Sequence, residues 1–123
     1  MSLRNERTGL VVAQALEPAF DSASRNRGLL GRAGLPDGHA LVLGPTNLIH
    51  TFFMRFPIDV LFVSRAGEVV KVASNVPARR LVGAWRGFAV VEMKAGALAG
   101  SGTRKGDRLT LEPAPPTGPK VSL

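Results

Sequence analysis

The chain of 123 residues contains no cysteine. This absence excludes disulfide bonds, thiolate metal sites, iron–sulfur clusters and a cysteine nucleophile. No apolar run approaches the roughly 18 to 20 residues that a helix needs to span a bilayer. The first residues also lack a basic-then-apolar leader with a small-residue cleavage site. We therefore expect a soluble protein that is cytoplasmic as given, or exported if a leader has been removed.

Motifs of several common enzyme classes are missing as well. The sequence has no nucleophile elbow, phosphate-binding loop or dinucleotide-binding fingerprint. The glycine pair Gly28 and Gly31 follows an expected helix, which is the wrong context for holding a phosphate. The two histidines, His39 and His50, lack the closely spaced partner ligands that metal sites use. We expect neither a metal ion nor a cofactor.

The length and composition are those of one globular domain. Domains commonly have about 100 to 150 residues, and the 45% of apolar residues is enough for a core. The last eleven residues, 113–123, include four prolines and a glycine, which disfavour both helices and sheets. We predict a single β domain over residues 1–112 and a mobile, proline-rich tail over residues 113–123.

The net charge of +7 comes from sixteen Lys and Arg against nine Asp and Glu. Twelve of the sixteen are Arg, whose guanidinium groups bind phosphate or carboxylate in bidentate geometry. These residues are scattered along the chain instead of forming a stripe, so we attribute the charge mainly to solubility. Weak nucleic-acid binding through dispersed arginines stays an alternative, and it predicts an affinity that falls steeply with salt.

Short apolar runs separated by glycine and proline dominate the chain and predict about seven short strands. One helix is expected to begin at Asp21 or Ser22, and a helical turn is expected at residues 95–99. We predict a mainly β fold with a minor helical part, namely a compact barrel or sandwich. Trp85 is expected to close one end of the barrel. The expected strands are residues 10–16, 40–43, 48–54, 58–63, 68–73, 88–93 and 108–112.

Ionisable side chains interrupt these apolar strands at a few positions. Because side chains alternate between the two faces of a strand, His50, Asp59 and Glu92 each lie on an otherwise apolar face. An unpaired buried charge costs several kcal/mol, so these groups need partners. We predict that they meet at one barrel mouth, with Asp59 and Glu92 as acceptors, Arg32 and Arg55 as donors to an anion, and His50 as a proton carrier.

A structural interpretation of the same residues stays open. In that case Asp59 bonds backbone N–H groups at the chain corner that precedes it, and Arg32 or Arg55 pairs with Glu92. His50 is then half-buried, with its hydrogen bonds satisfied. The strands would contain a hydrogen-bond network and no binding site.

Five short motifs occur in order over residues 8–112, and their combination is specific although each alone is weak. They are RGLLGR at 27–32, TFFMR at 51–55, PIDVLF at 57–62, VEMKAG at 91–96 and GDRL at 106–109. With these motifs the chain resembles the bacterial and archaeal family called domain of unknown function 192. The resemblance implies a compact, largely β single domain and no established reaction. It adds weight to Arg32, Met54, Asp59, Glu92 and Gly106 as positions of the family pattern.

The leading hypothesis is a small β module that binds a small anionic or polyhydroxylated (sugar-like) ligand, or a protein segment, at the polar mouth. The alternative is a hydrolase or lyase in which Asp59 or Glu92 acts as general base with His50 nearby. That reaction needs the groups within about 3 Å of one another. The residues predicted to bind are Arg32, His50, Met54, Arg55, Asp59 and Glu92.

Overall fold

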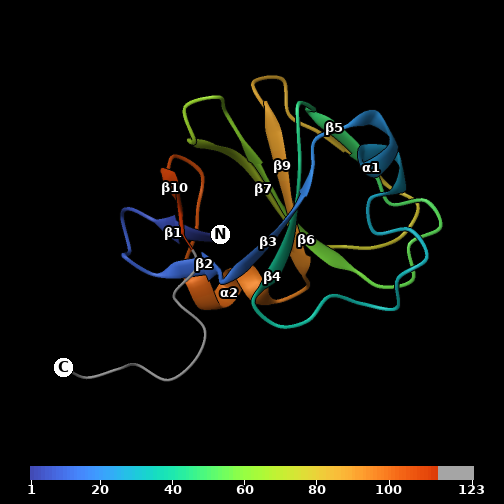
Figure 1. Cartoon of the computed structure of the whole chain (residues 1–123), viewed down its shortest axis with the longest axis horizontal. Helices are drawn as coiled ribbons and strands as arrows, with labels where there is room; N and C mark the ends of the chain where they lie inside the picture. Colours follow the sequence, from blue (N-terminus) through green and yellow to red (C-terminus); the bar gives the residue numbers. More distant parts are fainter. Residues whose placement is uncertain (114–123) are drawn as a thin grey trace.

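The computed structural model describes residues 1–113 (Figure 1). The tail predicted over residues 113–123 therefore lies, apart from its first residue, outside the described residues. Neither helix in the described part of the chain is long and apolar enough to cross a membrane. The elements are β1 (Ser2–Asn5), β2 (Val11–Ala13), β3 (Ala15–Ala19), α1 (Ser22–Arg27), β4 (His39–Leu43), β5 (Leu48–His50), β6 (Ile58–Val63), β7 (Val69–Val76), β8 (Leu81–Gly83), β9 (Ala89–Lys94), α2 (Ala97–Ser101) and β10 (Leu109–Glu112).

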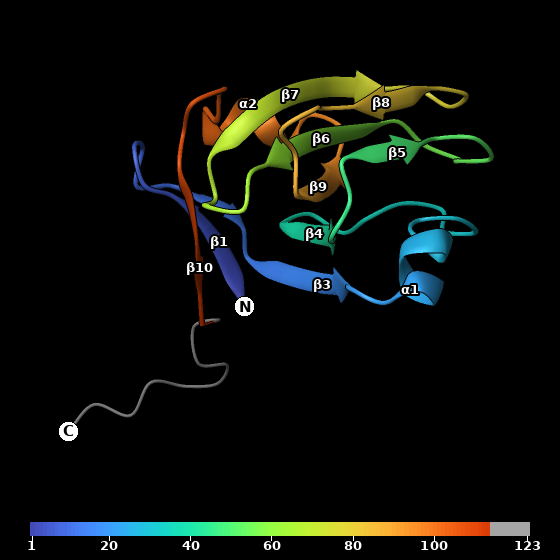
Figure 2. The ribbon, with the colours of Figure 1, turned by 90° about the horizontal axis from the view of Figure 1, so that it is seen from above.

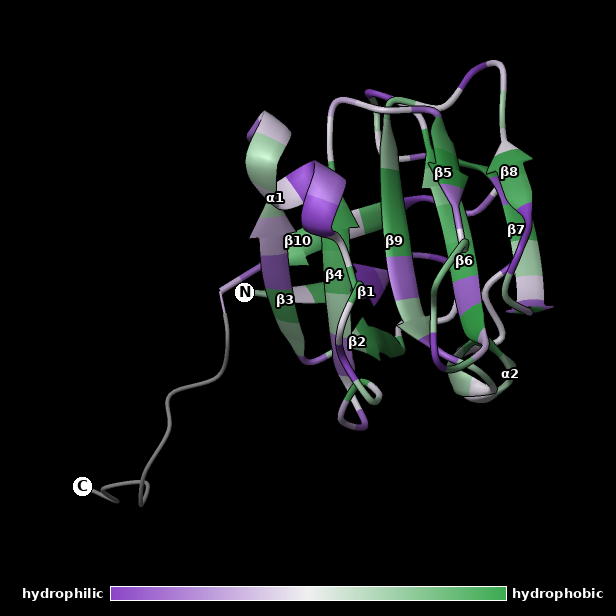
Figure 3. Cartoon of the chain, turned by 90° about the vertical axis from the view of Figure 1, so that its right-hand side faces the viewer, coloured by the Kyte–Doolittle hydropathy of each residue, from purple (hydrophilic) through white to green (hydrophobic). Residues whose placement is uncertain are grey.

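A five-stranded sheet forms the centre of the molecule, in the order β3-β4-β9-β6-β7. Only β3 and β4 run parallel, and every other neighbouring pair is antiparallel. β6 and β9 are apolar along most of their length (Figure 3), and most of their residues are buried. Strands that are apolar on both faces belong in the interior of a sheet, because both faces can then be covered.

Two smaller sheets lie at opposite ends of this central sheet (Figure 2). One has the order β10-β1-β2, and the other contains β5 and β8. All three sheets are open, so the strand pairing of the described residues does not close into the predicted barrel. The mainly β class and the two short helices agree with the prediction. The strands are more numerous than predicted because the first expected strand is split and β1 and β8 were not foreseen.

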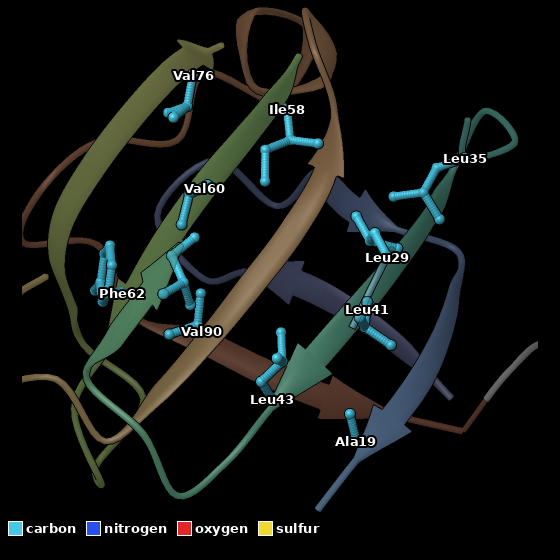
Figure 4. Close-up of a cluster of buried hydrophobic side chains, with 11 residues drawn as sticks. Ala19, Leu29, Leu35, Leu41, Leu43, Ile58, Val60, Phe62, Val76 and Val90 are labelled. Carbon is cyan, nitrogen blue, oxygen red and sulfur yellow. The ribbon is translucent and has the colours of Figure 1, made fainter. Parts of the chain in front are cut away.

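Apolar side chains are buried on both faces of the central sheet. On one face, called the α1 face here, Val60 of β6 and Val90 of β9 pack with Leu29, which follows α1 (Figure 4). On the other, the α2 face, Leu61 packs with Leu98 of α2. Alternate residues of the same strand therefore enter two separate cores.

Two local expectations are wrong. The strand predicted over residues 48–54 ends at His50, because the chain turns at Phe52 and Phe53, the latter with a φ of 66°. Phe53 is consequently 85% exposed. Trp85, predicted to close the end of a barrel, is 94% exposed.

Candidate functional site

Glu92 lies near the middle of β9 and points to the α1 face of the central sheet. It is paired with Leu41 of β4 and with Val60 of β6, and residues directly opposite on neighbouring strands share a face. Only 5% of Glu92 is exposed. A carboxyl group therefore occupies an otherwise apolar face.

A cavity of about 380 Å³ lies over this carboxyl group. The central sheet provides its base, and residues of α1 and β5 provide its sides. Leu29, Leu43 and Ile49 contribute apolar wall, while Glu92 and Thr46 contribute polar groups. The cavity combines apolar side chains with about as many polar ones. A concave site with several converging polar groups suits a small molecule that is partly polar.

The carboxyl group of Glu92 has no hydrogen bond or ion pair with another described residue, and burial alone raises its pKa to about 7. Within residues 1–113, every polar side-chain atom that is sealed from solvent has a hydrogen-bond partner. The oxygens of Glu92 must therefore reach the solvent of the cavity. Near neutral pH this group exists in both protonation states, so it can donate as well as accept a hydrogen bond.

Helix α1 places two arginines at the same cavity, Arg25 and Arg27. The helix begins after Asp21, whose carboxylate accepts a hydrogen bond from the backbone N–H of Ser24 at 2.8 Å. It ends at Gly28, which has a φ of 47° and turns the chain away. Both arginines lie in the last turn, so the capping residues of this short helix determine where their guanidinium groups emerge.

The two arginines differ in how firmly they are held. Arg25 Nη1 donates to the carbonyl oxygens of Phe20 at 2.7 Å and Gly44 at 3.0 Å, which fastens α1 to the chain that follows β4. Arg27 is exposed and takes part in none of the ion pairs between described residues. Arg27 is thus available to bind an anion at the cavity rim.

His50 and Met54 line this cavity as well, so it brings together three of the six residues predicted to bind. His50 is exposed at the end of β5, and its ring centroid lies 5.9 Å from that of Phe52. Met54 is half-buried and packs against the core of the α1 face.

Asp59 does not belong to this group, although it lies on the strand next to Glu92. Asp59 pairs with Met93 across the β6–β9 ladder and therefore points to the α2 face. Its Oδ2 accepts hydrogen bonds from the backbone N–H groups of Gly96 at 2.9 Å and Leu98 at 3.0 Å, and its Oδ1 accepts from Asn75 at 2.8 Å. The predicted meeting of Asp59 and Glu92 is therefore wrong, and of the two carboxyl groups only Glu92 shares a cavity with His50.

The two arginines predicted to hold an anion lie elsewhere. Arg32 forms an ion pair of 2.7 Å with Glu17 of β3, and this contact lowers the pKa of the Glu17 carboxyl group. Arg55 is exposed in the loop after β5. Arg25 and Arg27 of α1 line the cavity where Arg32 and Arg55 were expected. No signal in the sequence indicated Arg25 and Arg27, because the helix was predicted to run through Leu30, whereas it ends at Gly28. Only the packing of α1 shows that the two arginines line the same cavity as Glu92.

Another buried carboxylate, Asp107, is fully committed to structure. It accepts hydrogen bonds from Asn5 Nδ2 at 2.8 Å, Arg7 Nε at 2.6 Å and the backbone N–H of Arg104 at 3.0 Å. These donors, with Arg7 contributing most, hold the pKa of Asp107 well below its usual range. Among the buried acidic side chains of residues 1–113, Glu92 alone lacks such partners.

Comparison with known proteins connects these motifs to a family. The model of DUF192, described as "Uncharacterized ACR, COG1430", matches residues 3–111. The chain belongs to the DUF192 family. No curated protein matches this DUF192 member.

Two solved structures share its fold. A protein of unknown function from Novosphingobium aromaticivorans has 23% sequence identity and a TM-score of 0.78, and the match covers 90% of this chain and 84% of that chain. A protein of Sinorhizobium meliloti described as a "putative transcription regulator" has 22% identity and a TM-score of 0.74, with 89% of each chain covered. At this identity the likeness establishes the fold alone.

Proposed function

We propose that this DUF192 protein binds a small ligand bearing both hydroxyl groups and an anionic group, such as a sugar acid or a sugar phosphate, in the Glu92 cavity. The observation that carries the proposal is the unpartnered carboxyl group at the base of the cavity. Every other buried carboxylate in residues 1–113 is saturated with protein donors. A ligand hydroxyl supplies the hydrogen bond that Glu92 lacks.

The residues at the rim of the cavity indicate that the ligand also carries an anionic group. Arg27 is free of ion pairs with described residues, and Arg25 stands beside it, so the rim favours a carboxylate or phosphate. The cavity of about 380 Å³ falls within the range of small-molecule sites, about 300 to 1,000 Å³. Its apolar walls fit the carbon skeleton of such a compound.

Protonation of Glu92 gives this proposal a specific pH dependence. Burial raises the pKa of Glu92 to about 7, so the group is neutral in the folded protein below that pH. A neutral carboxyl group does not repel an anionic ligand, whereas the carboxylate formed above pH 7 does. We expect affinity for a hydroxylated anion to fall as the pH rises through 7.

A thermal-shift screen tests the proposal, with gluconate, glucose 6-phosphate and uncharged glucose as probes at pH 6 and pH 8. We expect the anionic probes to stabilise the wild type, and more strongly at pH 6. Glu92→Gln should abolish the pH dependence and Arg27→Gln should weaken the effect. Glu68→Gln and Arg108→Gln, both at exposed residues outside this cavity, are the matched controls. Equal stabilisation in Glu92→Gln and in the wild type at both pH values would contradict the proposal.

A second candidate function is a hydrolase or lyase that uses Glu92 as general acid or base. The observation in its favour is that Glu92, with a pKa of about 7, shares its cavity with His50. Incubation of any stabilising probe with the protein, followed by product analysis, separates the two functions. Turnover that Glu92→Gln abolishes favours the enzyme, and unchanged probe favours the binding protein.

A further inference from the structure

Two neighbouring loops, residues 51–57 and 77–81, are tied together at the end of the molecule away from β1 and β10 (Figure 2). We call them the paired loops. Thr51, only 1% exposed, makes the connection. Its Oγ1 donates to the carbonyl oxygen of Pro77 at 2.6 Å and accepts from the N–H of Arg80 at 2.9 Å. Its backbone bonds Arg80 and Arg79 as well. The loops therefore form one rigid unit.

The backbone of the paired loops presents an aromatic ring to solvent. Phe53 has a φ of 66° and Arg79 a φ of 67°. Bulky side chains rarely adopt this left-handed region, which costs of order 1 kcal/mol or more for each residue. Phe53 is 85% exposed, so packing of its ring within the protein offsets almost none of this strain. Backbone strain that is not offset by packing within the fold indicates that the exposed side chain contacts a binding partner.

Further apolar side chains are exposed on the paired loops and on the neighbouring β5–β8 sheet. Leu81 is 67% exposed and Phe52 is 39% exposed. Leu48 is 57% exposed and shares one face of the β5–β8 sheet with Leu81, because Leu81 is opposite His50 and Leu48 is two residues before His50. Leu48 and His50 also line the Glu92 cavity. The apolar surface thus includes aliphatic as well as aromatic groups.

Arginines accompany these apolar groups without acidic partners. Arg55, Arg79 and Arg80 are exposed, and none takes part in an ion pair between described residues. The paired loops contain no acidic residue. Three unpaired guanidinium groups next to protruding apolar side chains complement a surface that is anionic outside and apolar beneath.

We propose that the paired loops dock this protein on the surface of an anionic lipid bilayer. Phe53 and Leu81 enter the boundary between headgroups and acyl chains, while the three arginines bind lipid phosphates. Nucleic acid is a weaker fit, because an exposed leucine cannot stack on bases as an aromatic ring does. The docking surface adjoins the Glu92 cavity, which Leu48 and Met54 also line, but the proposal does not depend on the ligand of that cavity.

Co-sedimentation of the full chain with vesicles tests this proposal. We expect binding to vesicles of phosphatidylglycerol and phosphatidylcholine in equal parts at low salt, weaker binding at high salt, and none to pure phosphatidylcholine. Arg79→Gln with Arg80→Gln should lower the affinity about fivefold for each arginine removed. Arg104→Gln with Lys105→Gln removes the same charge from an exposed turn elsewhere, and it should change the affinity much less.

Phe53→Asn separates docking from folding. Asparagine tolerates a positive φ, so this variant should keep or raise the melting temperature while it weakens vesicle binding about tenfold. Leu81→Ser should also weaken binding, and Leu10→Ser, at a leucine that is 50% exposed outside the paired loops, should not. Failure of the wild type to bind anionic vesicles at low salt would overturn the proposal. So would equal losses in the two double variants, or Phe53-dependent binding of a single-stranded oligonucleotide or polyglutamate without binding of vesicles.

Discussion

Two buried carboxyl groups on neighbouring strands, Asp59 and Glu92, have opposite surroundings. Asp59 is 1% exposed on the α2 face and accepts three backbone hydrogen bonds. Glu92 is 5% exposed on the α1 face, where it has no partner among residues 1–113 and meets a cavity. Burial therefore does not distinguish a structural carboxylate from a candidate site. The presence or absence of saturating donors does, because a buried polar group without partners persists only at a cost.

The apolar packing of the α1 face gives the largest expected effect. Phe62 is completely buried beside the strand that carries Glu92. Phe62→Ala should lower the free energy of unfolding by about 3 to 5 kcal/mol, because it leaves a cavity in a packed core. Phe52→Ala is the control, since a ring that is 39% exposed should cost much less. Urea unfolding followed by circular dichroism measures both. If both variants lost a similar free energy of unfolding, the two rings would not differ in burial as the structure describes.

Removal of the Asp59 carboxylate tests whether its backbone hydrogen bonds stabilise the fold. Asp59→Ala leaves the N–H groups of Asn75, Gly96 and Leu98 without their acceptor. The expected loss is about 3 to 4 kcal/mol, measured by the same urea unfolding. Asp37→Ala removes an exposed carboxylate that pairs with Lys94, and it should cost less than about 1 kcal/mol. If Asp59→Ala were equally mild, the α2-face network would not be structural.

Glu92→Gln should have a smaller effect that depends on pH and has the opposite sign. Because the pKa of Glu92 is higher in the folded state, about 7, than its ordinary value of 4.5, the folded protein holds the proton more tightly. The resulting stabilisation is complete below pH 4.5 and is lost as the pH rises through 7, by about 3 kcal/mol in total. The variant lacks this loss, so its advantage over the wild type should grow by that amount between pH 4.5 and 8. Parallel pH profiles of the free energy of unfolding for the variant and the wild type would refute the assignment.

The sequence predicts that ionisable residues interrupt the apolar strands, but it does not predict on which face of the central sheet each of them lies. Period-two alternation correctly places Asp59 and Glu92 on otherwise apolar faces of their own strands. It says nothing about register between strands, and Asp59 pairs with Met93 instead of Glu92. A shift of one residue exchanges the faces, so the predicted carboxylate pair was separated by the sheet.

Two further features could not be predicted from the sequence: the position of the α1 arginines depends on tertiary packing, and the exposure of Phe53 depends on a turn. The start of α1 at Asp21 could be predicted from its capping residue, but the docking of Arg25 and Arg27 at the cavity depends on contacts with the chain after β4. Phe53 was assigned to a strand because it lies in a short apolar run. The hydrogen bonds of Thr51 override that pattern and hold Phe53 at a positive φ.

The most direct test of the unpartnered cavity carboxyl group is a carbon-13 NMR titration of the Glu92 side chain, with and without the probe that stabilises the protein best. The structure predicts a midpoint at about pH 7 in the free protein and a shifted midpoint once a ligand contacts the group. A midpoint at the ordinary value of about 4.5, unchanged by every probe, would contradict the account.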